Sequence, residues 1–163
     1  MWMQEVTSRF LVDVYQRLDP VQKEVVLAFS VYRKPVTLKA AQAIIMNDFS
    51  REQLLLALPK LMRHNLFLNL SETGFYQLQA VVANFAQSHF GDTSNQTDPK
   101  KLQEAHSHAA FYYQSLIKRH LSLEPYRNRT DLLIEMAWHL YNAGEDQNAC
   151  DLIRQEDLLK YLL

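Results

Sequence analysis

The sequence predicts a mainly α-helical protein with a single β-hairpin, built as two units joined by a polar linker. Amphipathic segments with helical spacing and capping residues occupy most of the 163 residues. Only residues 66–79 alternate with the period of a strand. Residues 91–98 are small and polar, which is typical of a linker. We therefore expect one domain over residues 1–90 and a helical region over residues 99–163.

Two amphipathic helices are predicted at the N-terminus. The first carries apolar side chains at helical spacing: Val6, Phe10, Val14 and Leu18. Asp19 can cap the second helix, Gln22 can complete a capping box with it, and Pro20 suits the first helical position. The Lys34-Pro35 pair then interrupts the chain.

Two further helices are predicted before the hairpin. Thr37 can cap the third helix, and Ser50 and Gln53 form a second capping-box pair at the start of the fourth. Pro59 lies inside the apolar pattern of the fourth helix. Because proline lacks a backbone donor, we expect it to kink this helix or to end its regular part.

Residues 66–79 predict the hairpin. Every second residue is apolar on either side of a polar loop: Leu66, Leu68 and Leu70 before it, and Tyr76 and Leu78 after it. Gly74 ends the loop and is expected to take a positive φ, as hairpin turns often require. A hairpin directly after a group of helices is the order of a winged helix.

The second half of the chain predicts helix pairs. Asp98 and Pro99 begin a long helix in the same way as the earlier cap and proline. A later helix ends where Gly144 suits a C-cap glycine. Two short helices are expected around residues 149–153 and 158–163. The aromatic residues of this half lie at helical spacing and are interpreted as helix packing: Phe111, Tyr112, Tyr113, Trp138 and Tyr141.

The last residues form a strongly apolar stripe, made of Leu158, Leu159, Leu162 and Leu163. A repeat array buries such a stripe against its next repeat or under a polar cap. Two interpretations stay open: the stripe packs back on the preceding helix pair, or the chain is a truncated piece of a longer protein. On the second interpretation, we expect these four leucines to bind a partner or a downstream repeat.

Composition and charge argue against several classes of protein. Lys and Arg total 17 and Asp and Glu total 18, whereas DNA-binding proteins usually carry a basic excess, so DNA is not the expected partner. Cys150 is the only cysteine, so no disulfide can form within the chain and a reducing compartment is expected. No apolar run approaches the roughly 20 residues that span a bilayer, and no signal-peptide pattern is present. We expect a cytoplasmic protein that does not contact a membrane.

Residues that could carry catalysis form no recognisable pattern. Glycine occurs at only three positions, and no phosphate loop is present. His106 and His108 are two residues apart, so they point to different sides of a helix, and Cys150 is remote from both. No spacing supports a catalytic triad. We therefore predict that the chain is not an enzyme and that it holds no catalytic residue, metal or cofactor of its own.

The helix before the hairpin is the one that would read DNA in a DNA-binding winged helix. It carries a modest positive excess through Arg51, Lys60 and Arg63. The hairpin loop, however, carries Glu72 and no lysine or arginine that could reach phosphates. This distribution favours a solvated charged helix face over a DNA-reading surface.

Residues 136–153, MAWHLYNAGEDQNACDLI, resemble a tetratricopeptide repeat. Ala137 matches the small residue of its first helix, Leu140 the following apolar position and Gly144 the glycine of its turn. Ala149 matches the small residue of its second helix. The usual Leu-Gly pair of the first helix reads Met136-Ala137 here. Small residues allow the two helices to cross closely.

Residues 1–90 resemble the winged-helix segment of bacterial NB-ARC-type signalling ATPases of the STAND class. The resemblance is carried by LMRHNLFLNL, the turn and FYQLQAVVANFA. The family's Met-His-Asp-Leu motif falls on residues 78–81, so that Gln79 stands at the histidine and Ala80 at the aspartate. In the family this histidine contacts the β-phosphate of bound ADP. Gln79 can donate a hydrogen bond there but cannot carry a charge.

The resemblance implies a non-catalytic regulatory and protein-interaction segment that couples nucleotide state to a helical-repeat sensor. Its partners would be an upstream ATPase domain and downstream helical repeats of the same protein. ADP or ATP would bind only in a full-length parent, with Gln79 as a possible phosphate contact. The alternative is a winged-helix transcription regulator with a helical effector or dimerisation domain, and a third interpretation is a plain repeat scaffold.

Overall fold

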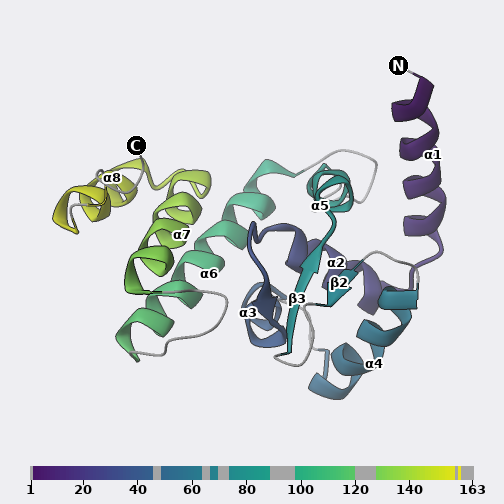
Figure 1. The fold of residues 1–163 in the computed structure, drawn as a ribbon, viewed down its shortest axis with the longest axis horizontal. Helices are drawn as coiled ribbons and strands as arrows, with labels where there is room; N and C mark the ends of the chain where they lie inside the picture. The colour runs from purple at the N-terminus through teal and green to yellow at the C-terminus, as the bar shows by residue number, and fades with distance from the viewer. Residues whose placement is uncertain are drawn as a thin grey trace. The chain divides into compact units, whose positions relative to one another are not determined.

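The protein is mainly helical and carries one small antiparallel sheet, as the sequence predicted (Figure 1). The computed structural model describes residues 2–45, 49–63, 67–69, 74–88, 98–119, 128–156 and 158. The chain divides into two compact units, Met1–Asp98 and Pro99–Leu163. The boundary falls at the end of the predicted linker, of which only Asp98 lies within the described residues.

The first unit combines helices with a three-stranded sheet. Its described elements are α1 (Trp2–Gln16), α2 (Pro20–Ser30), β1 (Val36–Thr37), α3 (Leu38–Ile44), α4 (Arg51–Arg63), β2 (Phe67–Asn69), β3 (Phe75–Leu78) and α5 (Ala80–Gln87). The strand order is β1-β3-β2, and both pairings are antiparallel. Strand β3 therefore lies in the middle, between the hairpin partner β2 and the early strand β1.

The pairing of β2 with β3 confirms the predicted hairpin. Phe67 pairs with Leu78 and Asn69 with Tyr76. Gly74 has a φ of 74°, as its place at the end of the loop predicted. Residues 70–73, which make up the rest of that loop, lie outside the described residues.

Strand β1 was not predicted, and the expectation of a two-stranded wing is corrected here. It comprises only Val36 and Thr37, which pair with Tyr76 and Phe75. Two residues are too few to show strand alternation. The strand exists because the open edge of β3 supplies hydrogen-bonding partners, which is a tertiary effect.

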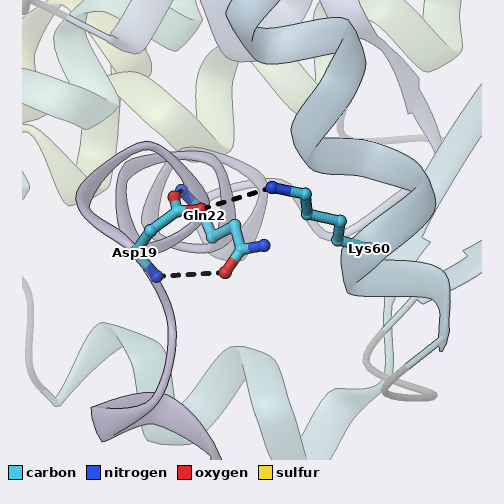
Figure 2. Close-up of polar contacts among 3 residues, drawn as sticks. All are labelled: Asp19, Gln22 and Lys60. Atoms are coloured by element: carbon cyan, nitrogen blue, oxygen red, sulfur yellow. Dashed lines mark hydrogen bonds and ion pairs between the residues drawn. The ribbon is translucent and has the colours of Figure 1, made fainter.

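Both predicted capping boxes are present. Asp19 Oδ1 accepts a hydrogen bond from the Gln22 backbone N–H at 2.8 Å, and Gln22 Oε1 accepts one from the Asp19 backbone N–H at 3.0 Å. Figure 2 shows that Lys60 of α4 reaches the same carboxylate, with Nζ 3.9 Å from Asp19 Oδ2. Ser50 and Gln53 make the equivalent reciprocal bonds at the start of α4. Asp19 thus both starts α2 and links it to α4.

The structure corrects the expected side-chain cap at Thr37, and of the two effects expected of Pro59 it corrects the end of the regular helix. Thr37 occupies the N-cap position of α3, but its side chain makes no capping hydrogen bond. Helix α4 continues through Pro59 to Arg63. The carbonyl that loses its donor belongs to Leu55, four residues earlier, and Leu55 is 45% exposed. Water can therefore replace the missing backbone bond, so the helix tolerates the proline.

The core of the first unit forms around α2, which packs against α3, α4, α5 and β3. Its fully buried side chains include Val25, Phe29 and Leu61. On the predicted apolar stripe at the N-terminus, Leu18 is buried as expected, but Phe10 is 59% exposed and its neighbour Leu11 is buried instead. The prediction is therefore corrected at Phe10.

The second unit contains α6 (Pro99–Lys118), α7 (Arg129–Asn142) and α8 (Asp146–Gln155). Helix α7 packs against both α6 and α8. One apolar cluster joins the three helices through Ala110, Leu140 and Ala149, with Met136 and Leu152 packed against it. Tyr113 is buried as expected, but Phe111 and Tyr141 are 70% and 66% exposed, so the prediction that they pack between helices was wrong.

The turn between α7 and α8 is a Schellman motif centred on Gly144. Its φ is 78°, its N–H donates to the Tyr141 carbonyl at 3.0 Å, and the Glu145 N–H donates to the Leu140 carbonyl at 2.9 Å. The predicted role of Gly144 is confirmed. The short final helix expected at 158–163 lies outside the described residues except for Leu158.

Candidate functional site

Gln79 lies at the junction of β3 and α5. It occupies the N-cap position with extended backbone angles (φ −60°, ψ 140°), and its carbonyl accepts the Ala83 N–H at 2.9 Å. Its side chain is half-buried and makes no capping hydrogen bond. The neighbouring Gln77 crosses to the loop before β1, where its Nε2 donates to the Arg33 carbonyl at 3.1 Å. The hydrogen bond from Gln77 thus ties the end of β3 to the loop before β1. A phosphate contact at Gln79 stays a prediction.

The outward face of α4 is mixed in character. Leu55 and Leu56 are 45% and 69% exposed. Leu56 lies one turn after Glu52 and one turn before Lys60, so the three side chains share a face. The pKa of the exposed Glu52 carboxyl is lowered, chiefly by a backbone hydrogen bond and then by the Ser50 side chain, so this carboxylate is negative at neutral pH. The face thus presents leucines between groups of both signs.

The cations of α4 differ in their surroundings. Lys60 lies beside the Asp19 carboxylate, which offsets its charge (Figure 2). Arg51 and Arg63 are exposed at the two ends of the helix. A DNA-reading helix would present donors and cations along its length to base edges and phosphates. The centre of α4 instead presents apolar side chains.

The second unit contains a buried pair of histidines that joins α6 to α7. His106 Nδ1 and His139 Nδ1 are 3.0 Å apart, and the side chains are only 4% and 0% exposed. Aromatic rings enclose the pair: Trp138 contacts His106 edge to face at a centroid distance of 5.1 Å, and Tyr113 lies against His139 at 5.4 Å. The pair is therefore a polar contact inside an aromatic environment.

The geometry of this pair restricts its protonation states. A 3.0 Å contact between two ring nitrogens is a hydrogen bond only if one Nδ1 carries a proton and the other does not. When both rings are neutral, they must therefore be different tautomers. Burial lowers the pKa of His106 from 6.5 to about 4, because the charged form loses its hydration. His106 can therefore stay neutral at pH 7, and the two Nδ1 atoms satisfy each other.

The predicted site residues are not brought together by the structure. Gln79 belongs to the first unit, and the leucine stripe belongs to the second. Leu158 is 1% exposed, so the expectation that it forms part of an open binding surface is corrected. Its apolar side chain is already covered within the chain. Leu159, Leu162 and Leu163 lie outside the described residues.

The described residues offer neither a metal site nor a membrane span. No three His, Cys, Asp or Glu side chains among them are placed to hold a metal ion. None of the helices in the same ranges is long and apolar enough to cross a bilayer.

His139 was missed by the sequence reasoning, which considered His106 only beside His108. The contact joins residues 33 positions apart, so no local spacing reveals it. The position of each histidine in its own helix nevertheless indicates that the side chain is buried. His106 and His139 each fall on the apolar stripe of their helix, next to Ala105 in α6 and Leu140 in α7.

Comparisons with known proteins give no further guide. No protein-family model matches the chain, and no match was found among curated proteins or among solved structures.

Proposed function

We propose that this chain is a regulatory and protein-interaction segment of a STAND-type (NB-ARC) signal-transduction ATPase. In this proposal the first unit is a winged helix that moves as a rigid lever between an ATPase domain and a helical-repeat sensor. The observation that carries the proposal is the order α2-β1-α3-α4-β2-β3, in which β3 closes a sheet between β1 and β2. Three helices followed by a wing, with a helical hairpin downstream, is the arrangement implied by the resemblance.

The outward face of α4 supports a protein contact over a DNA contact. Leu55 and Leu56 are exposed at its centre, where they would gain most from burial against another apolar surface. The cation at Lys60 is offset by Asp19. In a signalling ATPase this face would pack against the nucleotide-binding domain in one of two domain arrangements, and a ligand would select between them.

The second unit supports the repeat half of the proposal. Ala137 and Ala149 are buried, and Gly144 makes the sharp turn between α7 and α8. These are the positions at which the tetratricopeptide resemblance requires small residues. Such hairpins stack on neighbouring repeats to form extended binding surfaces, which suits a sensor.

Nucleotide would be bound by the parent protein and not by this segment. Gln79 at the start of α5 would face the phosphates of ADP in the closed arrangement, as the resemblance implies. One hydrogen bond from Gln79 would stabilise ADP by about 0.5–1.5 kcal/mol. The Gln79→Ala variant of the parent should release ADP up to about tenfold faster, and Gln155→Ala, at an exposed glutamine of α8, is the control.

The reading frame upstream of residue 1 provides the decisive test of whether this chain belongs to a STAND-type signalling ATPase. We expect it to encode an ATPase with a phosphate loop directly before this segment. A known DNA-recognition or receiver domain in its place would contradict the proposal.

Binding to duplex DNA tests the alternative, a winged-helix transcription regulator, with this chain alone. Fluorescence anisotropy at physiological salt should detect only weak binding that does not depend on sequence. The Arg51→Ala and Arg63→Ala double variant should change this binding little. Submicromolar, sequence-dependent binding that the double variant abolishes would favour the regulator, because the exposed ends of α4 would then contact DNA.

A further inference from the structure

We propose that His106 and His139 form an acid-sensitive lock between α6 and α7. Two neutral rings hold the helices together, and protonation of the pair separates them. The inference rests on the buried contact alone and does not depend on the chain being part of a signalling ATPase. Figure 1 shows α6 and α7 lying side by side, and α6 packs against no other helix of the unit as extensively.

The hydrogen bond between the rings survives only certain protonation states. In the neutral pair one Nδ1–H donates to the lone pair on the other Nδ1 across 3.0 Å. One added proton leaves this bond intact but places a positive charge in a site that is 4% exposed or less. A second proton occupies the only acceptor lone pair and sets two cations against each other. The contact then changes from attractive to repulsive.

Within the described residues, the titratable neighbours of the pair come from its own two helices. Tyr113 of α6 lies against His139, and the buried Glu135 of α7 lies one turn before His139. His108 follows His106 by two residues and therefore points to another side of α6. Desolvation by burial lowers the pKa of His106 to about 4 in these surroundings.

Three acidic groups of α8 and its two caps make contacts away from the histidine pair. Asp151 accepts a hydrogen bond from Gln147, and Glu156 pairs with Arg129. Glu145 accepts from Ser107 of α6 and from Asn148. The part of α8 in the shared core is apolar, through Ala149 and Leu152. Among the described residues, the buried titratable groups of the polar set on α6 and α7 are therefore His106, His139 and Glu135.

Trp138 provides a local reporter of the lock, since its ring contacts both histidines. Trp2 is the only other tryptophan, so a Trp2→Phe background isolates the signal. In this background we expect Trp138 emission to shift to longer wavelength in one cooperative step as the pH falls through the region of 5 to 4. Near-ultraviolet circular dichroism, which reports the fixed packing of aromatic side chains, should lose its signal from the α6–α7 contact in the same step.

The key variant is His106→Asn with His139→Asn. Asparagine places an amide near the position of Nδ1, so a hydrogen bond is retained while both titrations are removed. We expect the acid midpoint to fall by about one pH unit or more. His108→Asn is the matched control, because His108 lies on the same helix and its Nδ1 has no hydrogen-bond partner among the described residues. Its midpoint should equal that of the parent.

The proposal is overturned if the double variant and the parent share one acid midpoint. Should the double variant fail to fold, NMR titration of the imidazole nitrogens in the parent decides the matter. Rings that stay neutral until Trp138 emission shifts support the lock, whereas a ring titrating near pH 6.5 with unchanged emission contradicts it. Stabilisation of the parent by Zn²⁺ at pH 7.5 that the double variant abolishes would also contradict it, because the pair would then be a metal site.

Discussion

The two units bury different chemistry at their centres. In the described part of the first unit, the buried polar residues are Gln22 and Ser30, which are neutral and bond to their own helix or its cap. In the described part of the second unit the buried polar residues are His106, Glu135 and His139, all of which can ionise. An apolar core holds under any mild pH, whereas an interface built on histidines holds only while they are neutral. We therefore expect a fall in pH to destabilise the second unit more than the first.

The largest expected effect is the loss of apolar packing in the first unit. Leu61 is 0% exposed, and its replacement in Leu61→Ala should destabilise this unit by about 3–4 kcal/mol through lost burial and the cavity that remains. Urea unfolding followed by circular dichroism measures the loss. In the Trp2→Phe background, the unfolding midpoint followed by Trp138 emission should stay unchanged, because Trp138 belongs to the other unit.

Leu56→Ala is the matched control for this substitution. Leu56 lies on the same helix but is 69% exposed, so its truncation should change stability by less than about 0.5 kcal/mol. If Leu61→Ala lowers both unfolding midpoints equally, the two units unfold together and the comparison between them fails.

The second expected effect is acid sensitivity confined to the second unit. The folded pKa of His106 is about 4 and its ordinary value is 6.5, so the unfolded chain binds more protons between these values. Stability should therefore be complete above pH 6.5 and fall as the pH drops to 4, by about 3 kcal/mol in total. Urea midpoints of Trp138 emission at pH 7.5, 5.5 and 4.5 measure this decline. Urea midpoints of the second unit that do not change with pH would contradict the expected difference in acid sensitivity between the two units.

The third expected effect concerns the link between α2 and α4. Asp19→Ala removes both the N-cap of α2 and the ion pair with Lys60. We expect a loss of about 1–2 kcal/mol from the cap and little from the pair, because both side chains are exposed by about half. Asp19→Asn keeps the cap but not the charge and should stay close to the parent. Equal losses in the two variants would show that the ion pair, not the cap, dominates.

Local sequence signals predicted the parts of this fold that are set by local chemistry. Both capping boxes, the paired hairpin and the glycine turn at Gly144 depend on residues within a few positions of each other. The parts that were missed depend on distant neighbours. Strand β1 exists because β3 lies beside it, and α4 continues past Pro59 at a place where Leu55, whose carbonyl loses its donor, is an exposed residue.

The same distinction applies to the candidate site. The placement of Gln79 at the β3–α5 junction followed from the order of strand and helix. The histidine pair could not be predicted from spacing, since His106 and His139 come from different helices. The covered position of Leu158 likewise depends on packing that an apolar stripe alone does not reveal. Burial of a single residue is a property of the assembled unit.

The smallest expected effect compares the one glycine in each unit that takes a positive φ in the described residues. Gly74 has φ 74° with nothing within 4 Å of an added Cβ, and Gly144 has φ 78° with only Gln103 Nε2 at 3.7 Å. Steric space is therefore sufficient at both positions, and the cost of alanine is the left-handed backbone itself. We expect Gly74→Ala and Gly144→Ala each to destabilise their own unit by about 1 kcal/mol, measured by urea unfolding. Asparagine tolerates this conformation better, so the Asn variants should lose clearly less. If Gly144→Ala costs several times more than Gly74→Ala, the α7–α8 turn requires more than a positive φ, and the expectation that only the left-handed backbone sets the cost is wrong.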